Sequence, residues 1–217
     1  DKEGYATPFD YGLLAVNYDT KKIPVPPKNL AELGKLEKQL LVENPATSST
    51  GEEALLWSIA LYGENWKDFW NVLKPAVYTA EPGWSEAFAK FTAGEAPMMI
   101  GYATSNLFFS HDEEQSRFSI FLLDDGTFMY LEGASLVKKK ETKEGAKKFM
   151  EYILSEDFQN LVPKKNYMFP IIYISLTEEF KFVPVAEKTV KLSDEQVKDL
   201  VNNLDKYKSE LIEILKK

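Results

Sequence analysis

Apolar and polar positions are ordered along the 217-residue chain in a way that predicts strands interleaved with helices. Short apolar runs bounded by turn residues predict strands at 12–18, 39–43 and 96–101. Residues 54–61 are apolar on almost every face of a helix, which is typical of a buried helix. This alternation predicts the α/β fold class.

Other segments have the one-sided apolar spacing of amphipathic helices. This spacing predicts helices at 65–73, 84–92 and 143–161, and a long final helix at 193–217 with Ser193 as its N-cap. The final helix mixes both signs of charge, which indicates a solvated face rather than a nucleic-acid patch.

A turn sequence, Asp124-Asp125-Gly126, separates the apolar runs 118–123 and 127–131. An Asp-Gly pair between two apolar runs favours a tight turn between antiparallel strands. We therefore expect a β-hairpin here, with the two runs paired to each other.

The composition excludes several classes of function. The chain has 34 acidic and 26 basic residues, and its net charge of −8 disfavours binding to nucleic acid. Arg117 is the only arginine, which nearly excludes recognition of phosphate or carboxylate by arginine. The chain has no cysteine and only one histidine, His111, which removes most metal and triad chemistry. Its apolar runs are far shorter than the ~20 residues that span a bilayer.

Two motifs have a catalytic interpretation that the sequence disfavours. Gly83-Trp84-Ser85-Glu86-Ala87 has the placement of a nucleophile elbow, but it lacks the second glycine, and only His111 is available as a base. His111-Asp112-Glu113-Glu114 is acidic, but consecutive residues do not all converge on one metal ion, so a solvated loop is favoured. We predict no catalytic residue and no metal site, and we do not expect an enzyme.

A hydroxyl-rich turn at 47–51 precedes the buried helix. Free N–H groups, the positive end of the helix dipole and hydroxyl groups suit an anion or a polar ligand at such a place. The alternative is a capping box, in which Ser49 pairs with Glu52, or Thr50 with Glu53. The two glutamates disfavour a strongly charged phosphate there.

Four aromatic residues fall in turns or at the ends of predicted elements, where α/β proteins place their ligands. They are Trp84, Tyr102, Phe108 and Tyr167. Ordinary packing is the alternative for each of them.

Six motifs follow one another between Thr7 and about Leu204. They are Pro8-Phe9-Asp10-Tyr11-Gly12, Asn44-Pro45-Ala46-Thr47-Ser48-Ser49-Thr50-Gly51, Leu55-Leu56-Trp57, Gly83-Trp84-Ser85-Glu86-Ala87, Tyr102-Ala103-Thr104-Ser105, and Phe158-Gln159-Asn160 with Pro163 and Asn166-Tyr167-Met168-Phe169-Pro170. In these motifs, in this order, the chain resembles the thiamine-binding periplasmic proteins of ABC importers.

The resemblance implies a fold, a ligand and a set of binding residues. The fold is a type II periplasmic-binding-protein clamshell of two α/β lobes, and the ligand held between them is thiamine or a thiamine phosphate. The implied ligand-binding residues are Ser48, Ser49, Trp84, Tyr102, Ala103, Thr104, Ser105 and Tyr167. Tyr167 stands where the family has a tryptophan, and Phe108 where it has a tyrosine.

The resemblance also implies a domain organisation. Family members begin with a whole lobe that is absent ahead of the Phe9-Asp10-Tyr11-Gly12 string, so we expect an N-terminally truncated form without its signal segment. Residues 1–122 and 163–217 correspond to the second lobe, and 123–162 to a segment of the first. We expect the apolar helix face of that segment to find another partner, either its own lobe or a second copy of the chain.

The function implied is an extracytoplasmic, periplasmic or cell-surface, solute-binding component that delivers its ligand to the membrane permease of an ABC importer. No cofactor is expected. The alternatives are a binder of ferric ion or a small anion, or a pyrimidine-precursor enzyme on the same fold. Adjacent tyrosines typical of ferric relatives are missing at Tyr102-Ala103, and the enzyme would want a histidine-rich or cysteine-bearing site.

Overall fold

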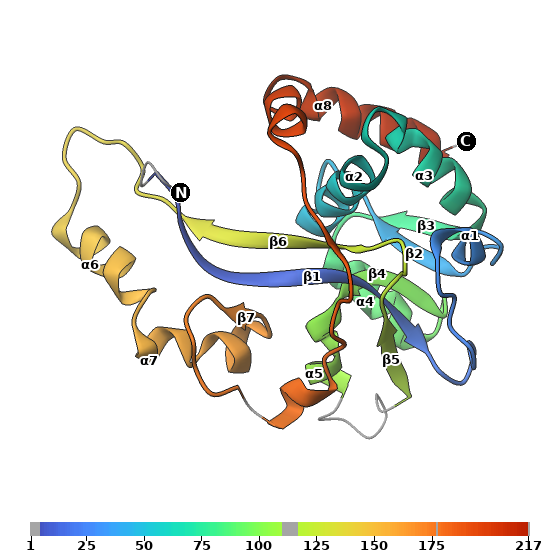
Figure 1. Ribbon diagram of the computed structural model, residues 1–217, viewed down its shortest axis with the longest axis horizontal. Helices are drawn as coiled ribbons and strands as arrows, with labels where there is room; N and C mark the ends of the chain where they lie inside the picture. Colours follow the sequence, from blue (N-terminus) through green and yellow to red (C-terminus); the bar gives the residue numbers. More distant parts are fainter. Residues whose placement is uncertain (1–4, 110–116, 177, 217) are drawn as a thin grey trace. The chain divides into compact units, whose positions relative to one another are not determined.

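The computed structural model describes residues 5–109, 117–176 and 178–216 (Figure 1). Its internal contacts divide the chain into two compact units. Unit 1 consists of Asp1–Gly12 and Tyr130–Phe182, and unit 2 of Leu13–Met129 and Val183–Lys217. The two lobes predicted from the resemblance have other boundaries than these two units. Because those lobes are defined for a longer protein, the assignment of residues to them stays a prediction.

The centre of unit 2 is a mixed sheet with the strand order β3-β2-β4-β1. Strand β2 (Leu40–Glu43) pairs in parallel with β3 (Val77–Glu81) on one side and with β4 (Met98–Tyr102) on the other. Strand β4 pairs antiparallel with β1 (Thr7–Asp19). The three strands predicted from the apolar runs are therefore confirmed, and β1 extends further toward the N-terminus.

Helices cover both faces of this sheet. Figure 1 shows α2 (Ser49–Tyr62), α3 (Trp66–Leu73) and α8 (Asp194–Lys216) on one face and α4 (Trp84–Ala93) on the other. The apolar surroundings predicted for α2 are confirmed, because its side chains are buried on several sides. The buried residues of α2 are Thr50, Gly51, Ala54, Leu55, Trp57, Ser58 and Ile59.

Short elements connect the larger ones in unit 2. They are α1 (Leu30–Leu33), η1 (Gly63–Asn65), η2 (Lys74–Ala76), η3 (Ala103–Ser105), α5 (Asn106–Phe109), β5 (Phe118–Phe121) and β8 (Thr189–Val190). Ser193 caps α8 as predicted, since its Oγ accepts a hydrogen bond from the Gln196 N–H at 3.2 Å. Among the helices described, none has the length and apolarity to cross a membrane.

The hairpin predicted at 124–126 is wrong. Strand β5 pairs with β1, and β6 (Thr127–Ala134) also neighbours β1, so the two do not pair with each other in the described sheet. Other elements hold the turn instead: Asp125 Oδ2 accepts from the Leu30 N–H at 2.7 Å, and the Gly126 carbonyl accepts from the Trp57 indole at 2.8 Å. Asp-Gly provides a tight turn, and tertiary contacts decide what the turn joins.

Unit 1 contains short helices around the ends of β1 and β6. They are α6 (Glu144–Tyr152), α7 (Glu156–Gln159), η4 (Val162–Asn166) and η5 (Glu178–Phe182), with the two-residue strand β7 (Phe169–Pro170) paired to β1. The single helix predicted at 143–161 is therefore wrong: it is interrupted after Tyr152, where Ser155 Oγ accepts from the Phe158 N–H at 3.3 Å and caps α7. A serine that caps a new helix ends the previous one.

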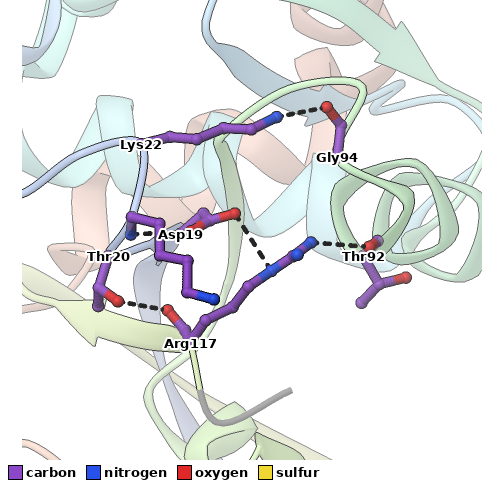
Figure 2. Close-up of polar contacts among 7 residues, drawn as sticks. Asp19, Thr20, Lys22, Thr92, Gly94 and Arg117 are labelled. Atoms are coloured by element: carbon purple, nitrogen blue, oxygen red, sulfur yellow. Dashed lines mark hydrogen bonds and ion pairs between the residues drawn. The ribbon is translucent and has the colours of Figure 1, made fainter. Parts of the chain in front are cut away.

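The only arginine serves the structure of unit 2 (Figure 2). Arg117 Nε lies 3.3 Å from the buried Asp19 carboxylate, and its Nη2 donates to the Thr92 carbonyl at the end of α4 at 3.3 Å. Its guanidinium also lies over the Phe118 ring, 4.7 Å from the centroid. At the same end of α4, Lys22 Nζ donates a hydrogen bond to the Gly94 carbonyl. Arg117 thus ties the end of β1 to α4.

Candidate functional site

Three turns that carry predicted site residues lie at one edge of the unit 2 sheet. Because β3, β2 and β4 are parallel, their carboxyl ends, Glu81, Glu43 and Tyr102, lie at the same edge. The turns are joined: Thr47 Oγ1 donates to the Pro82 carbonyl at 2.6 Å. We call this edge, with the turns 44–48, 82–83 and 103–105, the carboxyl edge. It is the part of an α/β sheet where ligands usually bind.

Arg117 is far from this edge along the sheet. It holds Asp19, the last residue of β1, and the antiparallel register places Tyr18 opposite Met98, the first residue of β4. Tyr102 is at the other end of β4. In the described part of unit 2, the carboxyl edge therefore has no guanidinium to receive an anion.

The start of α2 is built on the end of β2. Ser48, not Ser49 or Thr50, is the N-cap, and its Oγ accepts from the Gly51 N–H at 3.3 Å. Both predicted capping boxes are thus wrong, because the helix begins one residue earlier than the Ser49 box requires and two residues earlier than the Thr50 box requires. Gly51 is required here, since a Cβ at that position would lie 2.6 Å from the Glu43 carbonyl oxygen. Ser49 is exposed, whereas Ser48 is committed to the cap.

Tyr102 joins the end of β4 to the first turn of α2. Its hydroxyl lies 2.8 Å from Thr50 Oγ1 and donates to Glu53 Oε2 at 3.1 Å. The neighbouring Glu52 is paired with Lys208 of α8 at 2.5 Å, so its charge is balanced. Glu53 is the carboxylate that stands beside the Tyr102 hydroxyl.

Trp84 is the first residue of α4, and its half-buried ring lies in a stack. The ring is 4.7 Å from that of Phe88 at an angle of 17°. Its Nε1 faces the sheet at Gly101, 3.6 Å from where a Cβ of that residue would be. The same position would overlap Asn17 Oδ1, and Asn17 Nδ2 donates to the Tyr102 carbonyl at 3.2 Å. Because Gly101 has no side chain, Asn17 can donate to the Tyr102 carbonyl of β4 and Trp84 can lie close to the same strand.

Glu43 is a buried acid at the carboxyl edge that the sequence analysis did not select. It is 1 % exposed, and neither carboxyl oxygen has a hydrogen-bond partner among the residues that the structure describes. Burial raises the pKa of Glu43 well above its usual range, and the carboxylates of Glu53 and Glu81 raise it further. In the sequence, its only signal is a charged residue at the end of an apolar strand run.

The turn after β4 presents backbone and one hydroxyl rather than exposed side chains. Ala103, Thr104 and Ser105 form η3, and all three are buried. Ser105 Oγ has no hydrogen-bond partner within residues 5–109, 117–176 and 178–216. A buried hydroxyl of this kind is a hydrogen-bonding group still available to a water or a ligand.

Tyr167 belongs to unit 1, so its position relative to the carboxyl edge stays a prediction. It follows η4 with a φ of 55°, a left-handed conformation that is uncommon for residues other than glycine. Its ring is half-buried. The side chain of Phe108 and the segment 110–116, which includes His111, lie outside the described residues.

Two surface hollows of unit 2 are lined by none of the predicted site residues. One of about 660 Å³ lies between β3 and the end of α8, and another of about 880 Å³ lies between η1 and α8. Within the described ranges, no group of three or more His, Cys, Asp or Glu side chains is arranged to hold a metal ion. The carboxyl edge of unit 2 brings together aromatic, hydroxyl and carboxyl groups.

Curated relatives match most of this chain but only part of their own length. The chain is 36% identical over 200 residues to the thiamine-binding periplasmic protein of Brucella abortus, covering 90% of this chain and 60% of the relative. It is 30% identical over 192 residues to the thiamine-binding periplasmic protein of Escherichia coli K12, covering 88% and 59%. The chain therefore spans about three fifths of the length of these relatives.

Solved structures share the fold. A periplasmic thiamin binding protein superposes with a TM-score of 0.86 at 28% identity, covering 97% of this chain and 66% of that one. A ferric binding protein from Campylobacter jejuni superposes with a TM-score of 0.78 at 17% identity, covering 97% and 71%, which shows the fold alone. The α/β fold of the type II periplasmic binding proteins is thus confirmed.

A family model described as bacterial extracellular solute-binding protein matches residues 1–174. The match includes all of β1 to β7 and the three turns of the carboxyl edge. It thus extends over most of the chain. The chain belongs to the family of bacterial extracellular solute-binding proteins.

Proposed function

We propose that this chain is the ligand-binding part of an extracytoplasmic component of an ABC importer, and that its ligand is thiamine. The proposal is supported by relatives named thiamine-binding periplasmic protein at 30% and 36% identity. The mechanism is reversible binding followed by delivery to a membrane permease, without covalent chemistry. In the proposed whole protein, unit 2 lies in the second lobe and unit 1 includes the segment belonging to the first.

The groups at the carboxyl edge suit the chemistry of thiamine. The ligand has a flat aminopyrimidine and a cationic thiazolium ring. An aromatic face attracts a cation by roughly 0.5–2 kcal/mol, and the stacked rings of Trp84 and Phe88 provide such a face. The Ser105 hydroxyl and the exposed Ser49 supply hydrogen bonds to the polar ends of the ligand.

The charge at this edge favours unphosphorylated thiamine over its diphosphate. Glu53 lies 3.1 Å from the Tyr102 hydroxyl, and Glu43 is buried beside the same helix start. The Glu53 carboxylate attracts the thiazolium cation and repels phosphate. The described residues of unit 2 place no arginine at this edge, which also favours the unphosphorylated ligand. The single observation that carries the choice is the Tyr102–Glu53 contact.

Calorimetric titration of thiamine and of thiamine diphosphate tests the ligand. We expect thiamine to bind more tightly than thiamine diphosphate. Glu53→Gln should weaken thiamine binding about tenfold or less, because a charge near a cation contributes about 1 kcal/mol in a partly hydrated site. The difference in Kd between thiamine and its diphosphate should then become smaller. Glu52→Gln is the matched control, since the Glu52 carboxylate is already paired with Lys208. Tighter binding of the diphosphate would contradict the proposal.

The same titration on a longer protein tests the organisation. We expect weak binding by the 217-residue chain and tighter binding when the N-terminal region of a thiamine-binding relative precedes it, because one lobe makes only part of the contacts. If both proteins fail to bind thiamine, the ligand is a different one. Tight binding by the shorter chain alone would overturn the assignment of a two-lobed site.

We also expect self-association through the apolar side of α6 and the residues after it. Phe149 and Tyr152 are exposed at i and i+3 of α6, and Leu154 is exposed just after the helix. Analytical ultracentrifugation should show dimers that dissociate on Phe149→Glu. A chain that stays monomeric at millimolar concentration would contradict this expectation.

A further inference from the structure

A buried carboxyl group in unit 1 holds the residue that precedes Tyr167. Asp10 of β1 is fully buried, and its Oδ2 accepts a hydrogen bond from Asn166 Nδ2 at 2.6 Å. Asn166 is the last residue of η4, and Tyr167 follows it directly in a left-handed conformation. A residue in that conformation needs neighbouring contacts to hold it there. The Asp10–Asn166 bond holds the residue before it, and the Tyr130 hydroxyl lies 3.2 Å from Sδ of Met168, the residue after it.

The surroundings of Asp10 are short of positive charge. Glu132 of β6 interacts with the Asp10 carboxyl, while Lys164 and Lys165 of η4 are exposed, and β7, which pairs Pro170 with Asp10, brings no charge in its two residues. The second oxygen, Oδ1, is buried and receives no hydrogen bond from the described residues. Two carboxyl groups lie together at low cost only when one of them keeps a proton.

The electrostatics agree with this geometry. Burial, and after it the carboxyl group of Glu132, raise the pKa of Asp10 to about 7, against the opposing effect of the hydrogen bond from Asn166. The pKa of this acid is thus higher in the folded chain than in the unfolded one. Folding is therefore favoured at low pH, and this contribution is lost as the pH rises from about 4 to about 7.

We propose that Asp10 is the positioning residue for Tyr167, and that protonation of Asp10 fixes the turn in which Tyr167 meets the ligand. The proposal rests on the proposed function, because it assigns Tyr167 to the thiamine site. When the buried Asp10 ionises beside Glu132, the segment that Asn166 anchors is loosened. Thiamine affinity then falls as the pH rises through neutrality, and release is favoured on the alkaline side.

The chain labelled with ¹⁵N, followed by NMR between pH 5.5 and 8.5, tests the positioning step. We expect the Tyr167 amide and the Asn166 side-chain amide to shift with a common midpoint near 7. In Asp10→Asn, the amide oxygen still accepts from Asn166 and the NH₂ group donates to Glu132, so both signals should stay at their low-pH positions. Glu132→Gln, which removes the like charge, should lower the midpoint. His111→Gln is the control for the only histidine and should leave the titration unchanged.

Titration of thiamine at the same pH values tests the consequence for binding. We expect affinity to fall several-fold from pH 5.5 to 8.5 in the native chain and to be independent of pH in Asp10→Asn. A Tyr167 amide that still titrates in Asp10→Asn, or that does not titrate in the native chain, overturns the inference. Thiamine binding with the same pH dependence in both proteins also overturns it, while leaving the proposed function intact. If neither this chain nor the form extended by the N-terminal region of a relative binds thiamine at any pH, although Tyr167 titrates through Asp10, the proposed function fails and the positioning role stands.

Discussion

Replacing Trp84 with alanine should weaken thiamine binding about 5- to 30-fold, which corresponds to a loss of roughly 1–2 kcal/mol of stacking and cation–π attraction. The ring forms one face of the stack with Phe88 at the start of α4, beside the sheet at Gly101. Calorimetry on the native and variant proteins, extended by the N-terminal region of a relative, measures the difference in Kd. Trp84→Phe should retain part of the affinity, because it keeps a smaller aromatic face.

The control for this prediction is another aromatic residue of unit 2. Tyr78 of β3 is exposed and lies outside the turns of the carboxyl edge, so Tyr78→Ala should leave the Kd for thiamine unchanged. Circular dichroism should show that both variants keep their helical content. An unchanged Kd in Trp84→Ala would remove this residue from the site.

Gly51→Ala should destabilise unit 2 by about 2–4 kcal/mol, because the new methyl group has no space. Its Cβ would lie 2.6 Å from the Glu43 carbonyl oxygen and 2.8 Å from that of Asn44, and both are backbone atoms. The start of α2 would have to move away from β2, and with it Glu53 and its contact with Tyr102. Urea denaturation followed by tryptophan fluorescence measures the loss, since all four tryptophans of the chain, Trp57, Trp66, Trp70 and Trp84, are in unit 2.

The same replacement at Gly145 is the control. Gly145 is the second residue of α6, and a Cβ there would have nothing within 4 Å. Alanine is favoured over glycine in a helix by up to about 1 kcal/mol, so Gly145→Ala should be neutral or stabilising. Equal effects of the two replacements would show that helix propensity, rather than the contact with β2, determines the result at Gly51.

Local pattern predicted the scaffold of unit 2 and the place of its candidate site. Strands β2 and β4 are short apolar runs because both faces of a parallel sheet are buried, and α2 is apolar all round because it is buried on several sides. Each of these patterns can be recognised from the segment alone. Turn residues after such strands then mark the edge where ligands bind. Trp84 and Tyr102 were selected for this reason, and the structure places both at that edge.

What pattern missed depends on contacts between distant segments. The Asp124-Asp125-Gly126 turn is held by α1 and Trp57, which no local signal connects to it. The N-cap of α2 is Ser48 rather than Ser49 or Thr50, and Gly51 lies against the end of β2, a contact that no local pattern predicts. Glu43 and Asp10 are acids next to apolar strand residues, and only the fold shows that each is buried beside other carboxyl groups.

The carboxyl edge separates two kinds of residue in the same unit. The strands that give the sheet its stability end at Glu43, Glu81 and Tyr102, and the groups proposed to choose the ligand follow in short turns. Substitutions in these turns can therefore change the chemistry of the candidate site while the strands keep the sheet intact.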